Sequence, residues 1–247
     1  MVTRPIETDY AHHHIFANDR ADVWLHDRKS GTNRNLTQGA ADRSDFWASM
    51  PGKAHEYHKL LNGVLPAVDA VLAAGIADNE RLAVMGQSNG GFSTYALITL
   101  TNRFKAAVAI AGMTDFLSIA LQFEPSSLPR DVVEMGGTSG RLSMLESYMG
   151  FGLSWRSQLN LLNSPIAHID NVQTPILQLH GDFDGVPIAQ AEEYFTALQR
   201  LGKRAKLIKY IGDDHVFHSP ANISDSWQQI VGWLDEFTAA PGAKDAT

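Results

Sequence analysis

The chain has 247 residues, of which 44% are hydrophobic and 19% charged, as expected for a soluble globular protein of one or two domains. Its net charge of −7 argues against nucleic acid or an anionic membrane as a partner. The absence of cysteine excludes disulfides, thiolate zinc sites and cysteine nucleophiles. The N-terminal stretch MVTRPIETDYAHHHIF has no long apolar run, so we expect no signal peptide or membrane anchor and predict a cytoplasmic location.

Residues 1–43 are polar and differ in character from the rest of the chain. They contain one strand-like segment, Asp22–Leu25, followed by a turn at residues 29–33. The run His12-His13-His14 is interpreted as a solvated segment, because three adjacent side chains cannot all face one ion. We therefore predict no metal site, and no cofactor is predicted either.

From Ser44 onward, strand patterns alternate with helix patterns. The first helix is expected from Ala54 to Ala74, with Gly75 as its stop and a kink or restart at Pro66. Strands are then predicted at 81–85, 106–111, 175–179 and 205–210, and helices at 92–100, 189–201 and 227–237. Gly202 is expected to end the helix at 189–201. Repeated strand–helix units predict an α/β fold, with a mostly parallel sheet and helices on both faces.

The strongest functional signal is the sequence GQSNGG at residues 86–91, which lies between a predicted strand and a predicted helix. A G-x-S-x-G sequence in that context forms a sharp turn that exposes the serine at the edge of the sheet. Ser88 is therefore the candidate nucleophile. The backbone N–H of Asn89, at the start of the following helix, is a candidate donor to an oxyanion.

A nucleophilic serine needs a general base, and the base needs a carboxylate that orients it. The strand at 175–179 runs into HGDFDGVP, which supplies Asp182 and Asp184, and the strand at 205–210 runs into GDDHVF, which supplies His215. The carboxyl ends of parallel strands meet at one edge of a sheet, where ligands bind. The chain order Ser, Asp, His is that of an α/β-hydrolase. Asp213 and Asp214 are expected to be solvated loop acids.

Several motifs occur in the same order as in the catalytic domain of the prolyl oligopeptidase family of serine peptidases, which the chain resembles from residue 44 to about residue 240. They are GIAD at 75–78, RLAVM before GQSNGGF, NSPIA at 163–167, TP at 174–175, HGDFDGVP and GDDHVF. The resemblance implies that Ser88 is the nucleophile, Asp184 the catalytic carboxylate and His215 the base. In this chain only Gly185 separates Asp184 from Val-Pro, where the family usually has two residues, so Asp182 stays an alternative carboxylate.

We expect the strands that normally precede the nucleophile strand in this fold to be missing or replaced in this sequence. Residues 1–43 instead resemble the end of a β-propeller blade, which precedes the hydrolase domain in this family. The second oxyanion donor is therefore unassigned; Tyr10 and the histidines at 12–14 are the candidates. We divide the chain into this N-terminal segment, a hydrolase domain at 44–240 and a flexible tail at 241–247.

The predicted function is hydrolysis of peptide or ester bonds through an acyl-enzyme on Ser88. Two alternatives remain: a carboxylesterase of small esters, and a catalytically impaired fragment or binding module that keeps the triad residues. The expected partners are a peptide or small ester substrate and, across an exposed sheet edge, possible copies of the same chain. The segment from Leu117 to Leu162 lies where these enzymes place caps, and its aromatic residues are candidates for a substrate pocket: Phe123, Tyr148, Phe151 and Trp155.

Overall fold

The computed structural model describes residues 24–26, 33–35, 56–121 and 162–239. The chain forms two compact units, Met1–Asp78 and Asn79–Thr247. The predicted cap aromatics, Tyr10, the histidines at 12–14 and the C-terminal tail lie outside the described residues. Within the ranges given above, no helix combines the length and apolar character needed to cross a membrane.

The first unit contains a short hairpin and a long helix. Strand β1 (Trp24–His26) pairs antiparallel with β2 (Asn33–Asn35), so the strand begins two residues later than the sequence suggested. Helix α2 (Glu56–Ala73) runs through Pro66 without a break. Of the two forms of the prediction, a restart at Pro66 was therefore wrong, and a kink there stays a prediction. Proline lacks only its own N–H, and the hydrogen bonds of the turns on either side keep the helix continuous.

Glycine ends two helices as the sequence predicted. Gly75 follows α2 with a φ of 67°, and Gly202 follows α8 (Ala189–Arg200) with a φ of 68°. After each glycine the chain bonds back to the helix, through Ile76 N–H to the Val71 carbonyl at 3.2 Å and Lys203 N–H to the Leu198 carbonyl at 2.9 Å. These are Schellman caps, which place a residue in the left-handed region that glycine adopts without steric cost.

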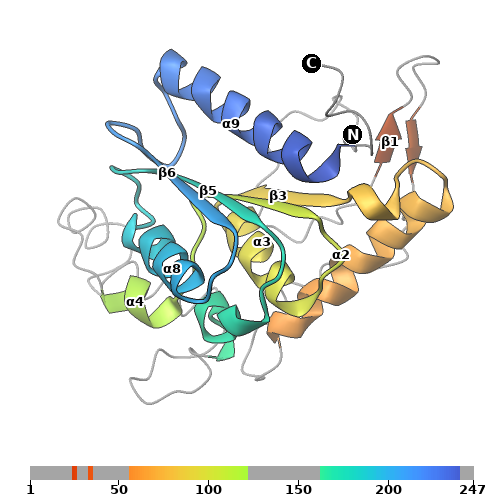
Figure 1. Cartoon of the computed structure of the whole chain (residues 1–247), viewed down its shortest axis with the longest axis horizontal. Helices are drawn as coiled ribbons and strands as arrows, with labels where there is room; N and C mark the ends of the chain where they lie inside the picture. The colour runs from red at the N-terminus through yellow and green to blue at the C-terminus, as the bar shows by residue number, and fades with distance from the viewer. Residues whose placement is uncertain (1–23, 27–32, 36–55, 122–161, 240–247) are drawn as a thin grey trace, which may run out of the picture. The chain divides into compact units, whose positions relative to one another are not determined.

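The second unit is built on a four-stranded parallel sheet with the order β3-β4-β5-β6 (Figure 1). The strands are β3 (Ala83–Gln87), β4 (Ala106–Ile110), β5 (Ile176–Gly181) and β6 (Ala205–Tyr210). A 3₁₀ turn, η2 (Asn79–Arg81), delays the start of β3 by two residues relative to the prediction. All three strand pairs are parallel, so the predicted α/β fold is confirmed.

Helices cover both faces of this sheet. Figure 1 shows α9 (Pro220–Thr238) on one face, and α3 (Asn89–Leu100) and α8 on the other. Two shorter elements, α4 (Phe116–Leu121) and η3 (Pro165–Asn171), lie in the connection between β4 and β5. This two-faced covering explains why β4 reads as a continuous apolar run and not as an alternating one, and why every residue of β5 is buried.

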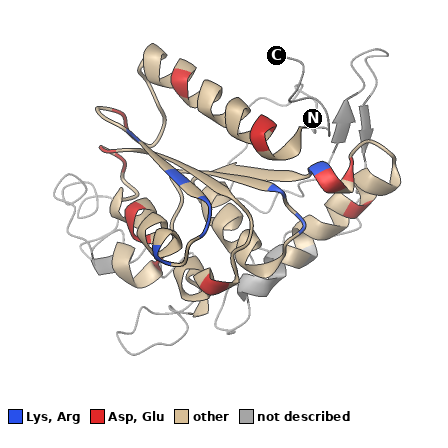
Figure 2. Cartoon of the chain, in the orientation of Figure 1, with Lys and Arg blue, Asp and Glu red and all other residues tan. Residues whose placement is uncertain are grey.

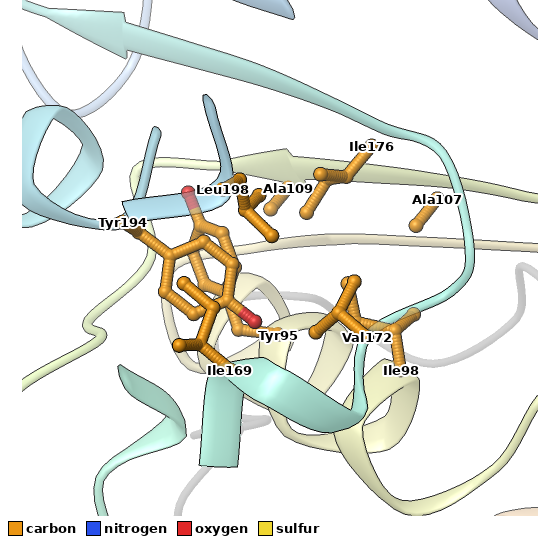
Figure 3. Close-up of a cluster of buried hydrophobic side chains, with 9 residues drawn as sticks. All are labelled: Tyr95, Ile98, Ala107, Ala109, Ile169, Val172, Ile176, Tyr194 and Leu198. Carbon is orange, nitrogen blue, oxygen red and sulfur yellow. The ribbon is translucent and has the colours of Figure 1, made fainter. Parts of the chain in front are cut away.

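The core on the α3 and α8 face is formed by alternate strand residues and by aromatic residues of the two helices (Figure 3). Ala107 and Ala109 of β4 are small, which lets α3 approach the sheet closely, and the rings of Tyr95 and Tyr194 lie 4.6 Å apart. The Tyr95 hydroxyl donates to the buried Gln178 Oε1 at 2.9 Å. Burial raises the pKa of Tyr95 well above its ordinary value, so the ring remains a neutral hydrogen-bond donor.

The core on the α9 face uses the intervening strand residues, Ala106, Val108, Leu177 and Leu179, which pack with Ile230 and Trp233 of α9. At the edge of the sheet, β6 carries lysines that bond to helices on opposite faces. Lys206 Nζ donates to Gln229 of α9 at 2.7 Å, and Lys209 Nζ pairs with Glu192 of α8 at 2.6 Å. Figure 2 shows this arrangement, with basic residues along β6 and acidic residues on α8 and α9. Charged edge residues of this kind also discourage strand addition.

Two glycines bring α3 against the end of β4. A Cβ on Gly91 would lie 2.7 Å from the Ile110 carbonyl oxygen and 2.8 Å from Gly112 Cα. A Cβ on the neighbouring Gly90 would meet nothing within 4 Å. The approach of helix to strand at this point therefore depends on Gly91 and Gly112, not on Gly90.

We predict that Gly91→Ala lowers the free energy of unfolding by about 1–3 kcal/mol, because the new methyl group overlaps backbone atoms that cannot move aside freely. Gly90→Ala is the matched control and should stay within about 0.5 kcal/mol of the wild type or be slightly more stable. Urea denaturation of the three proteins measures the difference. Equal stability of the two variants would contradict the proposed packing.

Candidate active site

Ser88 lies in the tight turn between β3 and α3, as the sequence predicted. Its backbone has a φ of 57° and a ψ of −117°, a strained conformation for a residue with a side chain. The turn is held by Ser88 N–H bonded to the Ile110 carbonyl and by Phe92 N–H bonded to the Ser88 carbonyl, both at 2.9 Å. Gly86 is required here as well, since a Cβ at that position would overlap the Gly90 carbonyl.

Asn89 is the first residue of α3, which begins directly after Ser88. A backbone N–H in the first turn of a helix has no carbonyl partner within that helix, and the helix dipole makes this end attractive to negative charge. The Asn89 N–H is thus placed to donate to an anion that forms at Ser88. The candidates for a second donor, Tyr10 and the histidines at 12–14, lie outside the described residues.

Asp184 and His215 meet at the carboxyl ends of β5 and β6. His215 Nδ1 lies 2.8 Å from Asp184 Oδ1, and the Val186 N–H donates to the same oxygen at 2.7 Å. Asp184 is only 5% exposed, whereas the His215 side chain is 35% exposed. Because a carboxylate only accepts, Nδ1 carries the proton, so in the neutral ring Nε2 has the lone pair that can accept another proton.

His180, at the end of β5, supports the same carboxylate from its other side. Its Nε2 lies 2.8 Å from the Val186 carbonyl and 3.3 Å from Asp184 Oδ2. The carbonyl is an acceptor, so Nε2 carries the proton and donates it to Val186, while Asp184 Oδ2 lies near the same N–H as an electrostatic contact. His180 is fully buried, so these contacts are shielded from water.

These contacts shift both pKa values. Burial opposes ionisation of Asp184, but hydrogen bonds from His180, His215 and Val186 outweigh it, so the pKa of Asp184 lies below its ordinary value. The hydrogen bond to Asp184 raises the pKa of His215 above the ordinary 6.5, although partial burial of the ring opposes this shift. The pair is therefore an ionised carboxylate beside an imidazole of increased basicity.

The other acidic residues of the two loops have different partners. Asp182 Oδ1 accepts the Gly212 N–H at 2.7 Å, which joins the loop after β5 to the loop after β6. Asp214 is exposed, as expected. The expectation for Asp213 was wrong: it is 2% exposed, and its carboxylate accepts from His218 N–H, Ser219 N–H and the Asn222 amide. The cause is that the chain turns back over the carboxylate on its way into α9, so that His218 and Ser219 before the helix and Asn222 in its first turn all supply donors.

The structure links the nucleophile turn to the base through Gln87, a residue that sequence reasoning missed. Gln87 Nε2 donates to the His215 carbonyl oxygen at 2.7 Å. Within the described ranges no hydrogen bond joins Ser88 Oγ to His215 directly, so the nucleophile–base contact stays a prediction. Nothing in the local sequence around Gln87 indicates a partner that lies 128 residues away.

Comparison with known sequences decides the family. The sequence profile of the prolyl oligopeptidase family matches residues 37–240. The chain belongs to this family of peptidases. A relative, the acylamino-acid-releasing enzyme of Arabidopsis thaliana, is 31% identical to this chain over 198 residues, which are 78% of this chain and 24% of the relative. The corresponding enzyme 2 from Oryza sativa subsp. japonica is 30% identical over 202 residues, 81% of this chain and 25% of the relative.

Solved structures of prolyl oligopeptidase relatives have the same fold. The puromycin-hydrolyzing peptidase of Mycobacterium tuberculosis superposes with a TM-score of 0.63 at 26% identity, over 73% of this chain and 25% of that one. The uncomplexed acylaminoacyl peptidase of Pyrococcus horikoshii gives a TM-score of 0.64 at 18% identity, over 82% of this chain and 31% of that one. The chain thus spans about a quarter of the length of the curated relatives it matches.

We predict that Asp213→Ala lowers the midpoint of thermal unfolding at pH 7 more than Asp214→Ala, because it leaves three donors of the His215 loop and the start of α9 without their acceptor. The pKa of Asp213 is lowered, chiefly by the His218 N–H, so this stabilisation is present above the ordinary pKa of 3.8. It is lost as the pH falls through the lower folded value. Calorimetry at both ends of this range checks the prediction, and equal midpoints for the two variants at pH 7 would contradict it.

Proposed function

We propose that this protein is a serine hydrolase that cleaves peptide bonds through an acyl-enzyme on Ser88. His215 is the general base, Asp184 orients it, and the Asn89 N–H donates to the oxyanion. The observation that carries the proposal is the 2.8 Å contact of His215 with the buried Asp184, at the same edge of the sheet as the strained turn of Ser88. This combination is the chemistry of a serine triad.

In the acylation step, Ser88 Oγ attacks the carbonyl carbon of the substrate while His215 Nε2 takes the hydroxyl proton. The carbonyl oxygen becomes an anion beside the Asn89 N–H, and the imidazolium is stabilised by the ionised Asp184. Collapse of the tetrahedral intermediate breaks the bond to the leaving group. His215 gives its proton to that group, so the base is neutral again and the acyl group remains on Ser88.

Deacylation repeats these steps with water as the nucleophile. His215 Nε2 takes a proton from water, the hydroxide adds to the acyl carbon, and the Ser88 oxygen leaves with the proton returned by His215. The products are an acid and the free enzyme. No group other than the side chains named and one water molecule is required for this balance.

The substrate class that we propose is a short peptide or an aminoacyl amide. Family membership supports peptide substrates, and the names of the similar proteins given above refer to acylamino acids and to puromycin. The same acyl-enzyme chemistry also hydrolyses small esters, so esterase activity is the alternative. Turnover of an aminoacyl p-nitroanilide, compared with that of a p-nitrophenyl ester, separates the two activities.

We predict that a fluorophosphonate probe labels the wild-type protein, with fluoride displaced by Ser88 Oγ, and that Ser88→Ala abolishes labelling. Ser93→Ala is the matched control, since Ser93 lies on the helix that follows Ser88 and its hydroxyl donates to the Asn89 carbonyl at 2.9 Å. This variant should be labelled at the wild-type rate. A folded wild-type protein that is not labelled would instead favour a binding module that keeps the triad residues without catalysis.

We predict that kcat/KM rises with pH along an acidic limb whose midpoint lies above 6.5, because only neutral His215 is a base and its pKa is raised. Asp184→Asn removes the charge that stabilises the imidazolium, so the midpoint should move to lower pH. The plateau should fall by roughly 10³–10⁴-fold because the imidazole loses its orienting acceptor. An unchanged acidic limb in Asp184→Asn would exclude Asp184 as the partner of the base.

A further inference from the structure

Gln87 connects the two halves of the candidate site. It is the last residue of β3 and directly precedes Ser88, and its side chain reaches the backbone of His215. In the sheet it pairs with Ile110, whose side chain packs with the α9-face core. Its side chain therefore lies on the α9 face of the sheet, the face toward which the loop between β6 and α9 leads. The donor must be Nε2, because a carbonyl oxygen only accepts.

The other contacts of the His215 loop hold it from the opposite direction. Asp213 ties the loop to the start of α9, and its carbonyl accepts the Phe183 N–H from the loop after β5 at 3.0 Å. The imidazole is held by Asp184, also in the loop after β5. Among the hydrogen bonds of the described residues, the contact from Gln87 is the one that fixes the His215 backbone relative to the strand that carries Ser88.

We propose that Gln87 is a positioning residue that sets the distance between the His215 imidazole and the Ser88 hydroxyl. This inference rests on the proposed function and adds a residue to it. The contact with Asp184 holds the imidazole at Nδ1 only, so the ring can still turn about that contact. The bond from Gln87 to the His215 carbonyl restrains the whole residue. Proton transfer from Ser88 to Nε2 needs a heavy-atom separation of about 2.6–3.2 Å, so a small drift of the loop removes productive geometry.

This role has an energetic signature that differs from a role in folding. Gln87 is exposed, and water competes for its hydrogen bond, so the bond adds little to the free energy of unfolding. A misplacement of about 1 Å at a reacting group, in contrast, costs about 100-fold in rate. Loss of the bond should therefore slow the chemical step strongly while stability and substrate affinity change little.

The test compares four full-length proteins. Gln87→Met keeps the length of the side chain but has no donor, whereas Gln87→Lys keeps a donor on a flexible stem. Gln199→Met is the matched control, because Gln199 also donates from an exposed amide to a backbone carbonyl, that of Ala205 at 3.3 Å, but lies on α8. The measurements are the second-order rate of fluorophosphonate labelling, the final labelled fraction, and kcat and KM for a p-nitrophenyl ester.

We expect Gln87→Met to lower the labelling rate and kcat by about 10- to 100-fold. The labelled fraction should reach the wild-type value, KM should stay within about twofold, and the unfolding midpoint should not move. Gln87→Lys should recover a large part of the rate, and Gln199→Met should match the wild type. A purely structural role would lower the labelled fraction and the unfolding midpoint instead.

Two results overturn the inference while the proposed function stands: a labelling rate for Gln87→Met within twofold of the wild type, or equal impairment of the Met and Lys variants. The second result would mean that the shape of glutamine matters and its donor does not. A folded wild-type protein that is not labelled at all overturns the proposed function, and the role of Gln87 falls with it.

Discussion

The buried carboxylate of Asp184 is the interaction on which the geometry of the candidate site depends. An ionised group in this position is costly unless its oxygens find donors. Here Oδ1 accepts the N–H of Val186 and the imidazole of His215, and the His180 imidazole lies 3.3 Å from Oδ2. His180 also bonds to the Val186 carbonyl, so the turn after β5 is closed on itself. The requirement for donors thus fixes the turn and, through it, the ring that serves as the base.

The parallel sheet explains why these groups meet. Because every strand of the second unit points the same way, the turn of Ser88, the Asp184 turn and the His215 loop all leave the sheet at one edge. Adjacent loops are then joined by their own bonds, as Asp182 with Gly212 shows. The strain at Ser88 is maintained in the same way. Gly86, Gly91 and Gly112 allow backbone segments to approach so closely that the turn has no room to relax.

Sequence reasoning predicted those features that are encoded locally. The strained turn follows from the spacing of GQSNGG, the helix ends from Gly75 and Gly202, and the fold class from alternating strand and helix patterns. It missed features that depend on how the loops fold. Asp213 reads as a solvated loop acid, but the chain turns back and places three donors on its carboxylate, and the partner of Gln87 lies 128 residues away. Such contacts leave no periodicity or spacing in a single sequence.

The difference between local and long-range encoding also bears on how the site divides its tasks. Ser88 and Asn89 are positioned by one short turn, so their geometry is set as soon as β3 packs on β4 and α3 forms. His215 instead lies in a loop that is held in place by several separate contacts, with β3, with the Asp184 turn and at the start of α9. The position of the nucleophile is therefore fixed by one local turn, whereas the position of the base depends on several contacts from different elements. The step most sensitive to distant substitutions should be proton transfer to His215, not formation of the Ser88 turn or binding of the oxyanion at Asn89.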